Sequence, residues 1–148
     1  MLFSLHKKSL ITFYFSILRP CFVLSQANMS SGIEDAGKFS VAYVTVPTVE
    51  VARSMGHGLV KNKLAACVNV IPQITSIYEW DDQIKEDSEA LLMIKTRTSE
   101  VDRLIEFVRT KHPYTVCEVI SLPIQNGNPP YLKWIGESVP VKDYTSNV

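Results

Sequence analysis

Residues 66–80 read ACVNVIPQITSIYEW, and residues 84–97 read IKEDSEALLMIKTR. Both runs are rich in β-branched and aromatic side chains, which favour extended strands. The short polar segment Asp81-Asp82-Gln83 lies between them, so the two runs predict one long β-hairpin. Pro72 lies inside the first run and cannot donate a ladder hydrogen bond, which predicts a bulge or an edge position for that strand.

A strand and a helix precede this hairpin. Residues 39–46 alternate in the manner of a strand, and Pro47 ends it. Thr48 is expected to cap a helix, because apolar side chains then recur at helical spacing. Gly56 and Gly58 weaken such a helix by roughly 1 kcal/mol each relative to alanine. Their presence therefore indicates close contact between this helix and the sheet.

A helix, a strand and a last helix follow the hairpin. Ser99 is expected to cap the first of these helices, with Asp102 completing a short capping box. Residues 116–122 predict a fourth strand, and Asn128 is expected to cap the last helix, with Pro129 at its first position. The order β-α-β-β-α-β plus a C-terminal helix predicts an α+β, ferredoxin-like fold. Its antiparallel sheet carries both main helices on one face.

The strand at residues 84–97 is apolar on both of its faces. Ala90, Leu92 and Ile94 point one way, and Leu91 and Met93 point the other way. The two main helices can cover only one face of the sheet, so something else must cover the second face. The C-terminal helix could do part of this. A partner subunit is the simplest cover for the rest, which predicts a homo-oligomer, and a monomer covered by its own helix is the alternative.

Residues 1–28 differ from the rest of the chain. A basic start, a short apolar stretch and small residues near Ala27 are typical of a signal peptide cleaved after Ala27. Arg19-Pro20 interrupts the apolar part, which makes it a poor membrane-spanning helix. Two other interpretations stay open: an uncleaved membrane anchor, and translation from Met29. The protein is expected to be secreted or membrane-associated if the leader is used, and cytoplasmic if translation starts at Met29.

Beyond the leader, the sequence predicts a flexible linker over residues 29–38, one domain over residues 39–140 and a polar tail over residues 141–148. The formal net charge is zero, with 15 basic and 15 acidic residues, which argues against nucleic acid as a partner. The chain has three cysteines, an odd number, and none has CxxC spacing, so neither a zinc site nor a disulfide framework is indicated.

Three groups of residues resemble one known family. They are Lys63-Leu64-Ala65-Ala66-Cys67-Val68-Asn69-Val70-Ile71-Pro72; Ile77-Tyr78-Glu79-Trp80 with Glu86-Asp87-Ser88-Glu89 and Lys95-Thr96; and His112-Pro113-Tyr114 with Glu118, Leu122-Pro123, Gly127-Asn128, Tyr131-Leu132 and Trp134. In this order and spacing they resemble the CutA divalent-cation-tolerance family over residues 39–139, most of all its vertebrate-type members. The resemblance implies a tight homotrimer of ferredoxin-like subunits and a link to tolerance of divalent metals. It also implies copper binding, as described for bacterial members, and association with membrane anchoring of acetylcholinesterase, as for animal members.

His112 and Glu118 are the candidate metal ligands. A neutral imidazole is a good copper ligand, and the carboxylate could add an oxygen donor. The cysteine that bacterial members of the family use for copper is absent, since the matching region reads Val44-Thr45-Val46. The alternative for His112 is a residue at a helix C-terminus whose ring bonds nearby carbonyls. A copper ion or another divalent cation is therefore one candidate ligand, and no cofactor is required.

The aromatic side chains allow two interpretations. They can pack in the core and between subunits, or they can line a pocket between subunits. In the second case Tyr114, Tyr131 and Trp134 would form walls of the pocket together with Tyr78 and Trp80. Lys95, His112 and Glu118 would then be its polar points.

No GxSxG, HExxH or phosphate-cradling loop occurs in the sequence. The resemblance attaches no chemical reaction to the family, so the chain is expected to be a non-enzymatic scaffold or binding protein. The alternative is a small enzyme that uses the intersubunit aromatic pocket or the Cys117 thiol. His112 would be the base beside that thiol, but no third group that would orient it is evident.

Overall fold

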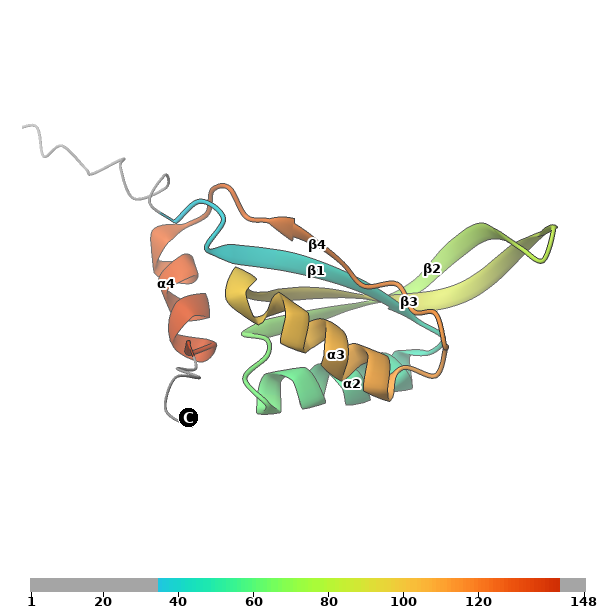
Figure 1. The fold of residues 1–148 in the computed structure, drawn as a ribbon, viewed down its shortest axis with the longest axis horizontal. Coiled ribbons are helices and arrows are strands. Elements are labelled where there is room, and N and C mark those ends of the chain that lie inside the picture. Colours follow the sequence, from blue (N-terminus) through green and yellow to red (C-terminus); the bar gives the residue numbers. More distant parts are fainter. Residues whose placement is uncertain (1–34, 142–148) are drawn as a thin grey trace, which may run out of the picture.

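A computed structural model describes residues 35–141 of the chain. Its centre is one four-stranded antiparallel sheet with the strand order β2-β3-β1-β4 (Figure 1). The strands are β1 (Phe39–Val46), β2 (Cys67–Trp80), β3 (Gln83–Arg97) and β4 (Ile120–Pro123). The helices are α2 (Val49–Lys61), α3 (Val101–Lys111) and α4 (Pro129–Ser138), with a 3₁₀ turn, η1 (Thr98–Glu100), before α3. This arrangement confirms the ferredoxin-like α+β prediction.

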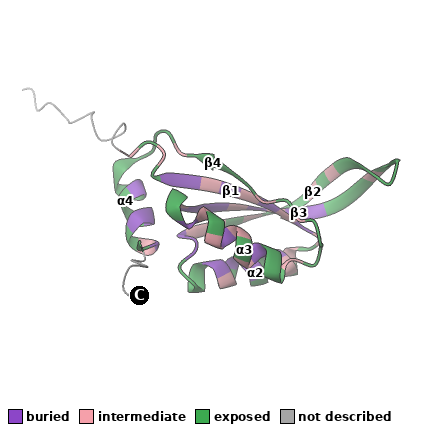
Figure 2. Ribbon diagram, viewed as in Figure 1, coloured by how far each residue is buried: buried purple, intermediate pink, exposed green. Residues whose placement is uncertain are grey.

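The two main helices cover one face of the sheet, and α4 lies at one end of it (Figure 1). Alternate residues of the central strands are buried (Figure 2), and they pack with residues of α2 and α3. This core contains Ala42, Val44, Val46, Ala90, Leu92 and Ile94 from the strands and Leu59, Leu104 and Val108 from the helices. Deleting one such large aliphatic side chain costs about 2–5 kcal/mol.

The two glycines of α2 lie where the helix approaches its neighbours. A Cβ at Gly56 would lie 3.3 Å from Cγ1 of Val68 in β2, which confirms the close contact between helix and sheet. A Cβ at Gly58 would lie 2.7 Å from Cζ of Phe107 in α3. The second glycine therefore permits close approach of α2 to α3 and not to the sheet.

The helix starts differ in how they are capped. Thr48 accepts a hydrogen bond from the Val51 amide at 3.2 Å, as the sequence predicted. The prediction of Ser99 as a cap is wrong, because Ser99 lies within η1 and Glu100 takes the cap position without a side-chain cap bond. Asn128 stands at the cap position of α4, but its side chain makes no cap bond; Pro129 begins the helix as expected.

The fourth strand is shorter than predicted. It begins at Ile120 instead of Val116, and it pairs with β1 only from Tyr43 back to Ser40. The preceding residues 112–119 contain no helix or strand. The ring of His112 binds the Thr45 carbonyl of β1 there, in place of a backbone amide of residues 112–119.

The hairpin of β2 and β3 extends past the rest of the sheet (Figure 1). β1 ends where Val46 pairs with Ala90, so residues 74–89, here called the hairpin arm, pair only with each other. A bulge between Ile71 and Ile74 contains Pro72, and β2 is an edge strand, so both expectations for Pro72 are confirmed. Asp81 and Asp82 both have positive φ, +52° and +57°, as a two-residue hairpin turn requires.

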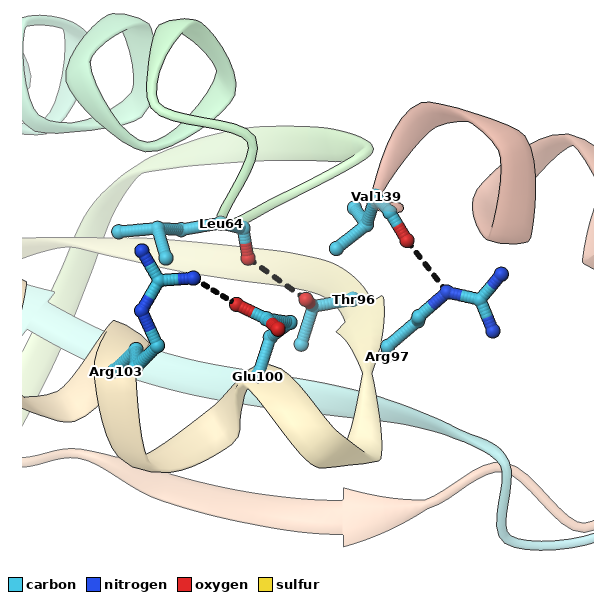
Figure 3. Close-up of polar contacts among 6 residues, drawn as sticks. All are labelled: Leu64, Thr96, Arg97, Glu100, Arg103 and Val139. Atoms are coloured by element: carbon cyan, nitrogen blue, oxygen red, sulfur yellow. Dashed lines mark hydrogen bonds and ion pairs between the residues drawn. The ribbon is translucent and has the colours of Figure 1, made fainter. Parts of the chain in front are cut away.

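A second apolar cluster attaches α4 to the sheet. Phe39 and Ala66 pack there against Leu132, Ile135 and Val139. Figure 3 shows the polar contacts nearby, including the Thr96 hydroxyl, which donates to the Leu64 carbonyl at 2.7 Å.

Arg97 closes the C-terminal end of α4. Its Nε donates to the Val139 carbonyl at 2.5 Å, and its Nη2 donates to the Gly136 carbonyl at 2.6 Å. The guanidinium carbon also lies 5.6 Å from the centre of the Phe39 ring. One side chain of β3 therefore satisfies carbonyls that the end of the helix leaves without partners.

The start of the domain is bound to the sheet from residue 35 onward. The Gly37 amide donates to the Ile124 carbonyl at 3.1 Å, and the Thr98 amide donates to the Lys38 carbonyl at 3.0 Å. The last four residues of the predicted linker thus form a turn that is hydrogen-bonded to the domain. The predicted leader, most of the linker and the tail after residue 141 lie outside the described residues. Within residues 35–141, no helix is long and apolar enough to cross a membrane.

Candidate functional site

The face of the sheet opposite α2 and α3 is apolar and only partly covered. Strand register places Val41, Tyr43, Leu91, Met93, Ile71, Ile120 and Leu122 on this face, which we call the open face. Ile120 and Leu122 in β4 are 54% and 56% exposed. Near α4, the Lys95 ammonium group donates to the side chain of Asn69 and to the Met93 carbonyl. The expectation that both faces of the third strand are apolar is thus confirmed.

A groove of about 960 Å³ continues from this face at its hairpin end. The hairpin arm forms one wall, the loop before β4 forms the other, and Thr45 at the end of β1 lies between them. Three aromatic side chains (Tyr78, Trp80 and Tyr114) and three carboxylates (Asp87, Glu89 and Glu118) line it. These aromatic rings are each more than 40% exposed, so the rings are accessible in a single chain.

Two hydroxyl groups bind carboxylates along the arm wall. Tyr78 donates to Oδ2 of Asp87 at 2.5 Å, and Ser76 donates to Oε2 of Glu89 at 2.6 Å. These pairs are diagonal across the strands, because Tyr78 lies opposite Lys85 and Ser76 lies opposite Asp87. The hydrogen bond to Asp87 is the main reason why the pKa of Tyr78 is raised to about 12.

Tyr114 lies on the opposite wall of the groove. Burial is the main cause that raises its pKa, and the negative charges of Glu89 and Asp87 raise it further. A tyrosinate is disfavoured where negative charge is already present. The negative charges of Asp87 and Glu89 thus add to the main causes that raise the pKa values of both tyrosines.

His112 positions the loop wall through both ring nitrogens. Nδ1 accepts the Tyr114 amide at 3.0 Å, which requires the proton to be on Nε2. Nε2 lies 2.8 Å from the Thr45 carbonyl and donates to it. The ring also lies 5.1 Å from that of Tyr114, between centroids. Because both nitrogens are engaged, a metal ion could bind this ring only by displacing one of the two bonds.

The other candidate metal ligand, Glu118, is exposed and lines the groove, whereas His112 does not line it. Within residues 35–141, no group of three or more His, Cys, Asp or Glu side chains could hold a metal ion. The metal role of these two residues stays a prediction. Cys117 is half-buried against the main core, so its side chain and that of Glu118 have different surroundings.

The four residues predicted to share a pocket do not share one within a single chain. Tyr114 lines the groove, but Lys95, Tyr131 and Trp134 do not. Lys95 is buried beyond the open face toward α4, four residues along β3 from Leu91, or about 13 Å. The rings of Tyr131 and Trp134 lie 5.3 Å apart on α4, between centroids, and are tilted by 32°. Burial, with a smaller contribution from the Cys67 side chain, raises the pKa of Tyr131. A pocket that joins these residues across subunits stays a prediction.

The sequence pattern indicated Tyr78 and Trp80 as pocket residues but not Asp87 and Glu89. Both carboxylates alternate with Ser88 on β3, so they continue the face of Leu91 and Met93. That alternation was the available signal. This alternation is a weak signal, because charged residues in a hairpin are usually exposed to solvent.

Comparison with known proteins identifies the family. The sequence profile of the CutA1 divalent ion tolerance protein family matches residues 40–138. The chain belongs to the CutA family. It is 63% identical over 112 residues to the Protein CutA homolog of Xenopus laevis, covering 76% of this chain and 74% of that protein. It is 57% identical over 99 residues to Protein CutA of Homo sapiens, covering 67% of this chain and only 55% of the human protein.

Solved CutA structures have the same fold. CutA1 from Oryza sativa superposes with a TM-score of 0.70 at 44% identity, covering 73% of this chain and 99% of that one. The divalent cation tolerance protein from Thermus thermophilus superposes with a TM-score of 0.67 at 47% identity, covering 69% of this chain and 99% of that one. The CutA family is not a family of known enzymes.

Proposed function

We propose that this protein is a non-enzymatic homotrimeric scaffold or binding protein that contributes to tolerance of divalent metal ions. The family relation supports the link to divalent metals. The main support for the trimer is the open face, where apolar side chains from all four strands lie on one surface. An apolar surface of this extent is normally buried against another protein.

The edges of the sheet support the same assembly. β4 is a short edge strand with exposed Ile120 and Leu122, and β2 is a long edge strand that continues into the hairpin arm. Exposed edge strands of this kind tend to aggregate unless a strand of another chain pairs with them. Three copies arranged around an axis would cover the open faces and bring edges of neighbouring copies together.

Sedimentation of the purified full chain at low micromolar concentration tests the assembly. We expect one species with three times the mass of the chain. A single monomeric species that does not change with concentration would contradict the proposal, because an exposed open face would then be stable in water.

The proposal also includes copper as a metal and acetylcholinesterase as a partner. Metal tolerance would involve copper or another divalent cation, and membrane anchoring of acetylcholinesterase would be a role of an animal member. That anchoring role would need residues 1–28, which lie outside the described residues. Co-precipitation with acetylcholinesterase from cells that express the chain with and without residues 1–28 tests it. Loss of the complex without the segment is expected, and absence of a complex in both cases would contradict it.

The compartment depends on the same segment. We propose that the leader directs the protein to the secretory route and is cleaved after Ala27. N-terminal sequencing of the protein from its own cells tests this. A start at the next residue, Asn28, is expected, whereas a start at Met29 would place the protein in the cytoplasm.

A further inference from the structure

Two charged side chains of β3 are buried, and neither forms an ion pair within the described part of the chain. Lys95 and Glu89 are each only 8% exposed. The Lys95 ammonium group donates to the Asn69 side chain and to the Met93 carbonyl, which are both neutral. A Glu89 carboxylate oxygen accepts the neutral hydroxyl of Ser76 at 2.6 Å. The ion pairs between described residues include neither charge. A buried charge without an opposite charge is costly, so each of the two favours a partner of opposite sign.

Both charges lie on the side of β3 that belongs to the open face. Successive residues of a strand point to opposite faces, so Glu89 and Lys95 share the face of Leu91, which lies between them. Six residues separate the two charges, which is about 20 Å along a strand. The carboxylate and the ammonium group therefore cannot reach each other within one chain.

Lys85 lies on the same face of β3 but is not placed to be the partner of Glu89. It is four residues away, about 13 Å along the strand, and Asp87 lies between the two. Its ammonium group donates to Oε1 of Gln83 at 2.8 Å, near the turn of the hairpin. The charge of Lys85 is thus closer to that of Asp87, and Glu89 keeps no ammonium partner in the described part of the chain.

A cyclic trimer brings different surfaces of neighbouring copies together. In such an assembly one patch of each copy contacts a second, different patch of the next copy. The open face is the surface that the proposed trimer buries. It carries a buried negative charge toward the hairpin arm and a buried positive charge toward α4, so its two ends are complementary between copies.

We propose that Glu89 of each copy forms an ion pair with Lys95 of the next copy. This inference rests on the proposed trimer and deepens it, because it names the contact that aligns the subunits. Three such pairs fix the register in which the apolar open faces pack. A shifted register would leave six buried charges without partners, which is costly.

A double-substitution cycle tests the pair. Lys95→Met leaves Glu89 buried without its ammonium group and should raise the dissociation constant of the trimer by about tenfold or more. When Glu89→Gln is added, no uncompensated charge remains. The double variant should then return to within about threefold of the unchanged chain. Sedimentation over a range of protein and urea concentrations measures the constants, and effects of the two substitutions that simply add would overturn the pair.

Two substitutions elsewhere are the matched controls. Lys133→Met removes an exposed ammonium group from α4, and Glu86→Gln removes an exposed carboxylate from the other face of the hairpin arm. Each should leave the dissociation constant within about twofold of the unchanged chain. Losses equal to those of Lys95→Met would overturn the pair, because net charge and not a specific contact would then explain them.

Carbodiimide coupling tests the contact in the unchanged chain. This reagent joins an ammonium group directly to a carboxylate that it touches, without a spacer. Because Lys95 and Glu89 lie about 20 Å apart along one strand, a link between them can only join two copies. Mass spectrometry of the digested trimer should detect this link. A trimer without the link would overturn the pair alone, whereas a chain that is monomeric throughout would overturn the pair together with the trimer.

Discussion

At the scale of single residues, His112 connects β1 to the wall of the groove. Its ring accepts the Tyr114 amide and donates to the Thr45 carbonyl. We therefore expect His112→Ala to lower the free energy of unfolding by about 1–3 kcal/mol, since two hydrogen bonds are lost. If His112 is a copper ligand as predicted, the same variant should also bind copper more weakly. Chemical denaturation and copper titration measure the two effects. An unchanged copper affinity in a folded variant would exclude His112 as a ligand.

Tyr78 and Asp87 form the second residue-scale feature that can be tested. The pKa of Tyr78 is raised from 10.0 to about 12, mainly by its hydrogen bond to Asp87. The folded chain keeps this proton where the unfolded chain loses it. The resulting stability is complete below pH 10.0 and is lost as the pH rises through about 12. Asp87→Asn should return the pKa of Tyr78 toward 10.0. Tyrosinate absorbance, taken as the difference from the same chain with Tyr78→Phe, measures it, and an unchanged pKa would contradict the assignment.

The sequence predicted part of this site. The aromatic residues could be found because large rings commonly line pockets, and Glu118 because a carboxylate can bind a metal ion. Asp87 and Glu89 could not, because their importance comes from diagonal contacts across the hairpin and from a loop about 30 residues away in sequence, and spacing does not encode such contacts. His112 was found, but its hydrogen bond to Thr45 joins residues 67 positions apart.

At the scale of elements, α4 depends on one arginine of β3. Arg97 binds the carbonyls of Gly136 and Val139 and lies over Phe39. Arg97→Met keeps an apolar chain but removes both charged hydrogen bonds, so we expect a loss of about 2 kcal/mol or more. Amide hydrogen exchange should show α4 opening first. Arg109→Met is the control: its pair with Glu106 is exposed and long, at 3.4 Å, and should change stability by less than about 0.5 kcal/mol. Equal effects of the two substitutions would contradict this role of Arg97.

The elements themselves were the most predictable part of the molecule. Strands β1, β2 and β3 agree with the sequence prediction to within about one residue, since alternation and β-branched side chains specify them directly. The errors occur where tertiary contacts override local preference. Residues 116–119 have strand composition but lie outside the ladder, after a loop whose His112 ring binds Thr45 of β1. Ser99 has the chemistry of a cap but lies within η1, so Glu100 takes the cap position of α3.

At the scale of the whole molecule, the open face links the fold to its assembly. Leu122 lies on this face and is 56% exposed in one chain. Leu122→Lys should therefore be tolerated by the isolated subunit. In a trimer the same substitution places three ammonium groups in apolar interfaces, where desolvation is costly. We expect it to weaken assembly by roughly tenfold or more in the dissociation constant, and sedimentation over a range of concentrations measures this.

Val60→Lys supplies the matched control for this substitution. Val60 is 41% exposed, but it lies on the outer surface of α2, on the opposite side of the sheet. A lysine there should leave the assembly unchanged. If both lysines weaken assembly equally, charge repulsion and not burial of the open face explains the result. If neither does, the open face is not the surface through which copies associate, and the edge strands β2 and β4 become the next surfaces to test.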